Sequence, residues 1–391
     1  MGVSRPPMQR PAWLVVGACI FAVATVAAAE GWRWSRASQH HAKPAPVSTA
    51  TPTPVTLTEI SHAIIPMPKG VPSAHASALA QLPQGDLIAF WWAGSRESGP
   101  DVKVYASRWS NGQWSDNWVV ASRESLGAAL GHGVRRIGNP VAWTAADGTV
   151  HLYVVATGLG GWAASRVVQL QSQDEGHSFK VRRVLPMSPV FNTSVLVRST
   201  PVGLADGGWW LPVYFEIGHK YPMLVSFDAN GDPQRLTRIG ARTRSLQPTL
   251  VPVSPTEIRA WMRDANKDHS VVQQAVSHDN GATWQDLGPT SIRNLGTSLA
   301  VLRLDSGSLL MLRNQGTNRK TARSTLSLSI STDGKGEVWT PLTDIVSGQE
   351  GDEFSYPTMF QVGDELHITY THQRQAIAHH RLKIHDGKDV L

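Results

Sequence analysis

Cysteine is almost absent from this sequence of 391 residues, which contains only Cys19. That residue lies in an uncharged apolar run, Trp13–Ala29, which follows Arg5 and Arg10 and ends in three alanines. A basic start, an apolar run and small residues at its end are typical of an export signal. The chain beyond residue 29 therefore has no disulfide and no thiol nucleophile.

The apolar run predicts that residues 1–29 form a signal peptide or, if uncleaved, a membrane anchor. We expect the rest of the chain to be exported, either secreted or periplasmic, or held at the inner membrane by residues 13–29. Residues 30–59 are rich in Pro, Thr and Ala and have no apolar period. This composition predicts a flexible, disordered tether.

Charged residues are also scarce, at 17% of the sequence, and the net charge is +6. Beyond residue 60 there are 31 Lys and Arg against 28 Asp and Glu, a net charge of +3. This excess is too small for a nucleic-acid surface, although it allows a local basic pocket. We therefore expect no nucleic-acid partner, and contact with a membrane only through the N-terminal segment.

A helical period is missing beyond the N-terminal run, and a turn followed by a short apolar run appears six times instead. Such runs predict β-strands. They are Leu87–Trp92, Val150–Val155, Trp209–Phe215, Ile258–Met262, Leu309–Leu312 and Leu366–Tyr370. Six hairpins predict an all-β fold for residues 60–391, a six-bladed β-propeller of four-stranded blades. His62–Pro66 could supply the outer strand of the last blade and close the ring.

A second repeat supports this architecture. In Ser277–Trp284, an Asp and a Gly close a tight turn and a Trp follows to plug the sheet edge. The same order recurs at Ser172–Phe179 and Ser331–Trp339, and more weakly at Ser226–Gly231 and Ser107–Trp114. The five starts lie 51 to 65 residues apart. A period of this length is typical of propellers and solenoids.

Polar residues gather at the ends of the six predicted strands. Directly after these strands come Arg96, Glu97, Asp101, Trp162, Glu216, Arg263, Arg313 and Arg374. The connections that enter the blades carry His75, Asn139, Gln247, Glu353 and Tyr356. Because equivalent loops emerge on one face of a propeller, this mixture predicts a pocket for a polar, acidic small ligand. The alternative is that loops are polar in any protein.

Several of these residues also carry a family resemblance. The matching stretches are His75–Ser77, Trp91–Asp101, Gly138–Val141, Gly160–Trp162, Leu211–Glu216, Leu246–Pro248, Glu353–Pro357 and Thr369–His379. On them the chain resembles the sialidase superfamily, and most of all its branch of BNR-repeat neuraminidase-like proteins with Asp-box turns. The resemblance implies a six-bladed propeller. It also implies an exo-glycosidase that acts on a sialic-acid-like sugar.

The chemistry of sialidases then suggests residue roles. Because the anomeric carbon of sialic acid bears a carboxylate, the nucleophile is a neutral Tyr, which the resemblance places at Tyr356. Arginines grip the substrate carboxylate, and Arg263 and Arg313 resemble the second and third of the triad. The acid that protonates the leaving oxygen would be Glu97 or Asp101.

Two departures from the sialidase pattern concern essential groups. The first triad arginine is replaced by His75, so the triad loses a charge unless Arg96 or Arg374 replaces it. The Glu that activates the tyrosine is replaced by Gln247, and an amide cannot act as a base. Two carboxylates, Glu216 and Glu353, remain as candidate bases. Asn139 and Trp162 are further candidate sugar contacts, Trp162 by stacking.

Two other functions remain open. In a polysaccharide lyase acting on uronic acids, His75 or Tyr356 would remove a proton beside a carboxylate that Arg263 neutralises. A non-catalytic glycan-binding or exopolysaccharide-assembly propeller would also lack the Glu and the Arg. The pairs His40-His41 and His379-His380 have no carboxylate at ligand spacing, so we expect no metal and no cofactor.

Overall fold

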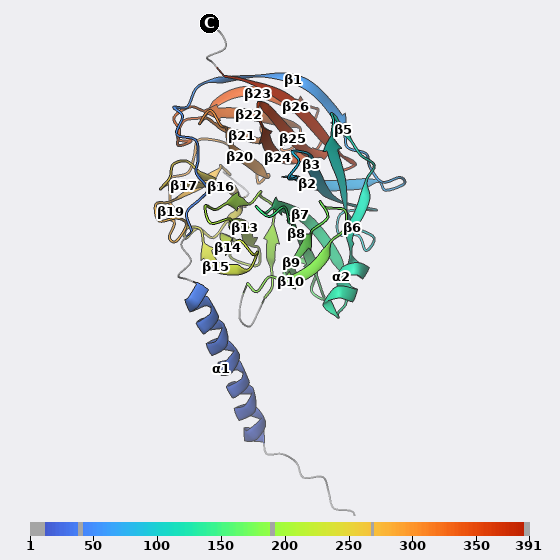
Figure 1. Cartoon of the computed structure of the whole chain (residues 1–391), viewed down its shortest axis with the longest axis vertical. Coiled ribbons are helices and arrows are strands. Elements are labelled where there is room, and N and C mark those ends of the chain that lie inside the picture. The colour runs from blue at the N-terminus through green and yellow to red at the C-terminus, as the bar shows by residue number, and fades with distance from the viewer. Residues whose placement is uncertain (1–11, 38–41, 188–191, 267–269, 387–391) are drawn as a thin grey trace, which may run out of the picture.

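The computed structural model describes residues 12–37, 42–187, 192–266 and 270–386. Within these ranges six antiparallel sheets surround a common centre, as Figure 1 shows. Each sheet is one blade of a β-propeller, and the predicted all-β six-bladed fold is confirmed. The first strand of each blade lies nearest to the centre, and the fourth lies at the rim.

The strands follow the chain around the ring. Blades one and two contain β2 (Ser73–Gln81), β3 (Leu87–Gly94), β4 (Lys103–Ser110), β5 (Gln113–Trp114) and β6 (Trp118–Ser122), then β7 (Arg136–Thr144), β8 (Val150–Thr157), β9 (Ser165–Ser172) and β10 (Lys180–Val184). Blades three and four contain β11 (Val195–Val197), β12 (Val202–Gly203), β13 (Trp209–Phe215), β14 (Tyr221–Phe227) and β15 (Pro233–Arg238), then β16 (Ser245–Pro252), β17 (Ile258–Asp264), β18 (Gln273–Ser277) and β19 (Gln285–Asp286). Blades five and six contain β20 (Leu299–Arg303), β21 (Leu309–Asn314), β22 (Thr325–Ser331) and β23 (Thr340–Ser347), then β24 (Phe354–Val362), β25 (Glu365–His372), β26 (Ala376–Asp386) and β1 (Val55–Ile64).

The ring closes where the two ends of the propeller share a blade. Strand β1 pairs antiparallel with β26 from Val55 opposite Asp386 to Ile64 opposite Ala378. The next residue continues the contact, with Ile65 N donating to Ile377 O at 2.9 Å. The predicted closure by His62–Pro66 is therefore confirmed, although the strand begins earlier, at Val55. Closure of this kind leaves the sixth sheet complete with a strand from the start of the propeller.

All six apolar runs form the second strand of a blade, as predicted. Every side chain of β3 and of β8 is buried. Both faces of these strands are covered because each blade packs against its neighbours; one core cluster, for example, joins Phe90 and Val104 of blade one to Leu152 and Val168 of blade two. A continuous apolar run, rather than strict alternation, is the expected pattern for such strands.

The five repeated turns all join the third strand of a blade to the fourth, and four of them contain an Asp. In the turn Ser277–Trp284, the Asp279 carboxylate accepts from Thr283 N at 2.8 Å and from Thr283 Oγ1 at 2.6 Å. Gly281 has a φ of +75°, and a Cβ there would lie 3.4 Å from Leu224 and Trp210 of the preceding blade. The turn therefore closes its own hairpin and also contacts the preceding blade.

One short helix within the propeller was not predicted. Helix α2 (Arg123–Leu130) begins with a capping box between Ser122 and Ser125 and ends at Gly131, whose φ is +72°. Only Leu126 of this helix is buried, so its sequence carries almost no apolar period. A single turn of 3-10 helix, η1 (Gly161–Ala164), follows β8.

The N-terminal segment forms helix α1 (Ala12–Ala37), which projects away from the propeller in Figure 1. Among the residues whose side chains are described, no helix combines the length and apolar composition needed to cross a membrane. Cleavage, anchoring and export of this segment remain predictions.

Residues 42–54, here called the strap, lie against the propeller instead of forming the free tether that the sequence predicted. Ala45 N donates to Gly203 O at 2.9 Å. Arg303 Nη2 donates to Ser48 O at 3.0 Å, and Ser308 Oγ donates to Thr53 O at 2.5 Å. The extended backbone of a Pro-rich segment leaves its carbonyl groups free, and the propeller supplies donors for them.

A buried histidine pair links the last blade to the first. His379 Nε2 lies 3.0 Å from His367 Nδ1, and Trp114 Nε1 of blade one donates to His379 Nδ1 at 3.1 Å. Since an indole can only donate, His379 is neutral and carries its proton on Nε2. Burial lowers the pKa of His367 to about 4 and that of His379 to about 3.

We predict that acid weakens the closure of the ring. Because both pKa values are lowered in the folded state, the contribution of these two histidines to the free energy of unfolding is constant above about pH 6.5. It falls as the pH drops toward 4. The loss is on the order of 3 kcal/mol for each histidine. The free energy of unfolding, measured with urea at pH 7.5 and at pH 4.5, gives this loss. The difference between the two pH values should shrink in His379→Gln but not in the control His132→Gln, whose side chain is exposed; an equal difference in both variants would contradict this prediction.

Candidate active site

A cavity of about 230 Å³ opens on one face of the propeller, where the first strands begin and the second strands end. It is lined by seven of the predicted site residues, which come from the first four blades and the sixth: Glu97, Asn139, Trp162, Glu216, Gln247, Arg263 and Tyr356. The expectation that equivalent loops bring these side chains together therefore holds for this subset. Trp92, Ser98 and Tyr214 also line the cavity.

Three of the lining side chains are held by irregularities in the innermost strands. Asn139, Gln247 and Tyr356 each precede a proline, and the strand register shifts at each of them. The φ angles of Gln247 and Tyr356 are +52° and +55°. Bulges redirect a side chain out of the regular pleat, and a left-handed non-glycine residue costs of order 1–3 kcal/mol. Stable packing around the ring offsets this cost, so that the polar groups reach the cavity.

The ring of Tyr356 is surrounded by cations and a neutral histidine. Its centroid lies 4.2 Å from that of His75, and the guanidinium carbons of Arg198 and Arg323 lie 5.2 Å and 5.7 Å from it. Burial, together with Arg374, Arg323 and Arg198, holds the pKa of His75 well below its usual range. His75 is thus uncharged at neutral pH, and the fixed charge of a first triad arginine is absent at this position.

Glu353 does not act on Tyr356 in this structure. One carboxylate oxygen binds Arg323 Nη1 at 2.5 Å and Ser355 Oγ at 2.8 Å, and the other binds Arg374 Nε at 2.6 Å. Burial alone would raise the pKa of Glu353, but Arg323, Arg374 and Ser355 outweigh it and lower the pKa. Both oxygens thus bind arginines, and no hydrogen bond from the tyrosine to Glu353 forms among the described residues. Among the described residues, the Tyr356 hydroxyl has no carboxylate partner.

Arg374 is also committed to protein carboxylates. Besides Glu353 it binds Glu97, so it joins a loop of blade one to two loops around blade six. The prediction that Arg374 points freely into the pocket to grip a substrate is therefore wrong for this structure. Two negative partners compensate its charge, which leaves it suited to positioning Glu97.

Of the two acid candidates, only Glu97 lines the cavity. Asp101 accepts from Ser95 N and Ser95 Oγ, both at 2.7 Å. These hydrogen bonds lower the pKa of Asp101 and tie it to its own loop. Arg96, in the same loop, is exposed and does not line the cavity. Glu97 is thus the carboxyl group placed to reach a ligand.

The arginines expected to form a triad differ in their positions. Arg263 lines the cavity, and its buried Nε has no hydrogen-bond partner among the described residues. Arg313 ends β21 outside this cavity and donates from Nη1 to Asn314 O at 3.2 Å. Burial lowers the pKa of Arg313. Arg263 is therefore the arginine available to an anionic ligand.

Gln247 is buried beside Tyr214, which also lines the cavity. Its Nε2 lies 3.4 Å from the hydroxyl of Tyr214, and its buried Oε1 has no partner among the described residues. Burial raises the pKa of Tyr214, so that residue is a neutral hydroxyl. Gln247 can thus accept a hydrogen bond from a ligand, but it cannot take a proton.

Sequence reasoning did not assign a role to Arg198 or Arg323. Arg198 follows the very short strand β11 and is buried, donating from Nη2 to Pro357 O at 2.8 Å. Arg323 lies in the connection between β21 and β22. Strand β11 is too short to give an apolar run, so neither arginine follows one of the six predicted strands, which was the signal that led to the other arginines.

Trp162 lies over a glycine of the neighbouring strand. Its Nε1 donates to Ser98 Oγ at 3.0 Å, and a Cβ on Gly138 would be 2.9 Å from its Cη2. The absence of a side chain at Gly138 thus lets the indole lie at the cavity wall. This position agrees with the predicted sugar contact.

The pair His379-His380 has no metal geometry. Within the described residues, no three His, Cys, Asp or Glu side chains gather as they would around an ion. His379 binds Trp114 and His367, and His380 lies 3.0 Å from the Tyr370 hydroxyl. His40-His41 lies outside the described residues.

A family model for the BNR repeat-like domain matches residues 85–368. This chain belongs to the BNR repeat-like family. A search of curated proteins finds no match. The family assignment agrees with the sialidase-like resemblance seen in the sequence and with the six blades of the structure.

Solved structures of similar fold include several glycan-active proteins. A protein of unknown function from Dyadobacter fermentans has a TM-score of 0.65 and 14% identity, covering 84% of this chain and 99% of its own. The Hadza microbial sialidase Hz136 has a TM-score of 0.65 and 16% identity, covering 82% and 66%. An alpha-L-arabinanase from Penicillium chrysogenum, complexed with arabinobiose, has a TM-score of 0.59 and 16% identity, covering 85% and 100%. At these identities the likeness establishes the fold.

We predict that the contact between Gly138 and Trp162 is tight. Gly138→Ala should destabilise the protein by about 1–3 kcal/mol, because the new methyl group must displace the indole. In a Trp162→Ala background the same change should cost almost nothing, and a double-mutant cycle by urea unfolding measures the difference. The control is Gly133→Ala, where nothing lies within 4 Å of the new Cβ. Equal costs in both backgrounds would show that the indole does not restrict this position.

Proposed function

We propose that the BNR repeat-like propeller is an exo-glycosidase of the sialidase type, which removes a terminal acidic sugar from a glycan. The observation that carries this proposal is that Arg263, Tyr356 and Glu97 line one cavity. An unpartnered guanidinium group suits a substrate carboxylate, and a neutral hydroxyl is the nucleophile that such a substrate tolerates. We also propose that residues 1–29 direct export, which would bring the enzyme to extracellular glycans.

The size of the cavity favours an exo mode of action. Its volume of about 230 Å³ is below the range of roughly 300–1,000 Å³ that is usual for drug-sized ligands. Such a volume suits a single sugar ring rather than an extended chain. The Trp162 indole would stack on that ring, and Asn139 and Gln247 would bind its polar substituents.

The reaction uses groups from three blades. The Tyr356 oxygen forms a bond to the anomeric carbon as the bond to the leaving oxygen breaks, and Glu97 donates the proton that the leaving oxygen takes up. The phenol proton needs an acceptor, and Glu216 is the remaining carboxylate in the cavity. Catalytic hydrogen bonds are often long without substrate, so the missing contact to Tyr356 leaves Glu216 eligible. Water then hydrolyses the tyrosyl intermediate.

A second candidate is a glycosidase that uses two carboxylates on a neutral sugar. Glu97 and Glu216 line the same cavity, while the Tyr356 hydroxyl has no carboxylate partner among the described residues. Two carboxyl groups around the scissile bond are the usual arrangement in glycoside hydrolysis. The similar fold of an arabinanase bound to arabinobiose makes a neutral substrate worth testing.

Tyr356→Phe separates these candidates, because it removes the hydroxyl and keeps the ring. With aryl glycosides of sialic, ketodeoxynonulosonic and uronic acids, we expect kcat to fall by several orders of magnitude while KM changes little. Glu97→Gln should lower kcat by about 10²–10⁴-fold. Aryl arabinofuranosides are the neutral comparison.

The outcomes are distinct. Hydrolysis of neutral sugars that survives Tyr356→Phe but not Glu216→Gln would replace the tyrosine mechanism with the two-carboxylate mechanism. An unsaturated product with a new ultraviolet absorbance would indicate a lyase. Ligand binding without turnover of any substrate would indicate a glycan-binding protein.

Arg263→Lys tests recognition of the substrate carboxylate. Lysine keeps the charge but loses the planar fork, so we expect KM for an acidic aryl glycoside to rise about tenfold. Arg313→Lys is the matched control, because Arg313 ends the equivalent strand of the next blade outside the cavity. Equal effects of the two substitutions would show that Arg263 has no special role in binding.

A further inference from the structure

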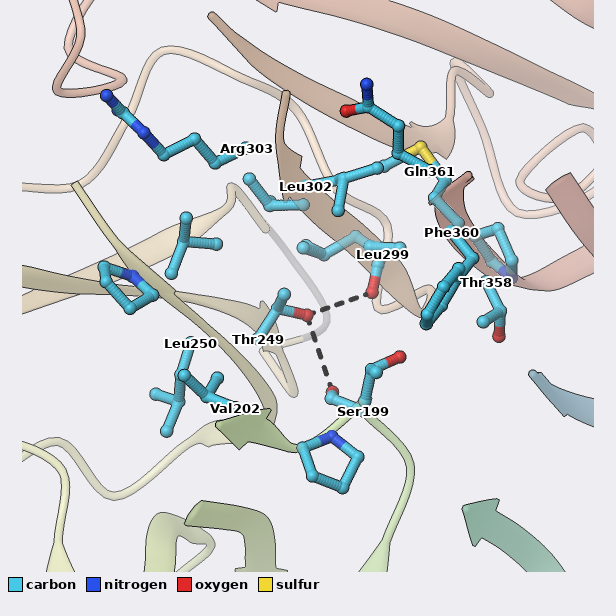
Figure 2. A pocket seen from close by; sticks show the side chains of 18 of the residues that line it. Ser199, Val202, Thr249, Leu250, Leu299, Leu302, Arg303, Thr358, Phe360 and Gln361 are labelled. Atoms are coloured by element: carbon cyan, nitrogen blue, oxygen red, sulfur yellow. Dashed lines mark hydrogen bonds between the residues drawn. The ribbon is translucent and has the colours of Figure 1, made fainter. Parts of the chain in front are cut away.

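A second and larger cavity, of about 330 Å³, lies where the innermost strands converge. Its walls come from β16, β20, β24 and the segment around β12. Figure 2 shows its side chains, with Arg303 on one side, Phe360 on the other, and Leu250, Leu299 and Leu302 among those between them. Most of this lining is apolar. We call this space the central cavity.

The central cavity is distinct from the candidate active site. Strands β16 and β24 contribute to both sites. Their residues Gln247 and Tyr356 line the active site, while the later residues Thr249 and Phe360 line the central cavity. Strand direction therefore places the two openings toward opposite faces of the propeller. Buried Arg198 lines the central cavity and stands over the ring of Tyr356. Among the described residues, none lines both spaces.

The central cavity has positive groups whose hydrogen-bonding capacity is unused. Arg303 Nη2 donates to Ser48 O of the strap, but its buried Nε and Nη1 have no partner among the described residues. The Nε of Arg198, a residue only 4% exposed, is unpartnered too. Buried donors of this kind carry a desolvation penalty unless an acceptor is present.

The acidic residue at the rim does not meet this need. Asp305 lines the cavity, but it accepts a hydrogen bond from Gln361 Nε2 at 3.1 Å and forms no ion pair with Arg303 within the described residues. An apolar space is a poor site for ordered water, which needs two to four polar partners. Apolar walls and free guanidinium donors together fit a ligand that has an apolar body and an anionic end.

We propose that the central cavity binds an amphiphilic anion, a medium-chain carboxylate in the simplest case. Its carboxylate accepts hydrogen bonds from Arg303, and its chain packs against Leu250, Leu302 and Phe360. Val47 of the strap also lines the cavity, so the segment before the first strand forms part of the site. An apolar cavity of about 150 Å³ holds benzene. Roughly twice that volume suits a chain of about eight carbons.

Octanoate and octanol test the two halves of this proposal. In isothermal titration and in thermal unfolding, octanoate should bind the full chain and raise Tm, because a ligand of the folded state stabilises it by mass action. Octanol has the same chain without the charge, and we expect it to bind at least about tenfold more weakly. In Arg303→Gln, octanoate and octanol should bind with similar affinities. Leu302→Trp, which fills the cavity, should abolish the binding of both compounds.

Several results would overturn the proposal. These are absence of saturable octanoate binding, equal affinities for octanoate and octanol, and octanoate affinity that is unchanged by Arg303→Gln. Should Leu302→Trp fail to fold, Arg303→Gln alone decides. The Arg303 side chain is only half-buried at the side of the cavity, so its replacement should leave the protein folded. Arg313→Gln is the control for loss of a half-buried arginine elsewhere. The proposal does not depend on glycan hydrolysis, since the two sites share no lining residue.

Discussion

The pairing of β1 with β26 is the constraint on which the rest of the structure depends. A closed ring of antiparallel blades holds the first strand of each blade at a fixed position. The starts of these strands therefore meet at one opening of the propeller, and their ends meet at the other. Residues more than 250 positions apart, such as Glu97 and Arg374, come into contact for this reason. Without the closing strand, blade six would have an open edge and its Tyr356 would lose its fixed position relative to blade one.

The architecture was predictable because it is repeated. Each blade contributes an apolar second strand and most contribute an Asp turn, and repetition makes each weak local signal informative. The Asp279 turn illustrates why these signals are reliable: its hydrogen bonds are local, and its glycine packs on the preceding blade. Helix α2 shows the opposite case. Its capping residues are clear, but a helix that buries only Leu126 has almost no apolar pattern to detect.

The composition of the candidate site was predictable only in part. Topology indicates which loops share a face, and this was enough to bring Glu97, Arg263 and Tyr356 together. It does not indicate which side chain meets which. Arg374 lies just beyond β25 and Arg263 lies near the end of β17, but the carboxylates that face Arg374 bind it from two sides. Pairings of this kind depend on side-chain geometry within a few ångströms, which one sequence does not contain.

The charges around the cavity suggest how the site works without the expected first arginine. Arg263 lines the cavity, and Arg198, Arg323 and Arg374 lie around its tyrosine and acid, while the facing carboxylates are Glu97, Glu216 and Glu353. Arg323 and Arg374 pair with Glu353 and Glu97, and Lys220 pairs with Glu216, so Arg198 and Arg263 form no ion pair among the described residues. Their positive charge suits a substrate carboxylate. His75 remains neutral because a positive charge there would be buried and close to Arg374, Arg323 and Arg198. Loss of one arginine from the first blade is thus compatible with recognition of an acidic sugar, since the neighbouring blades supply the charge.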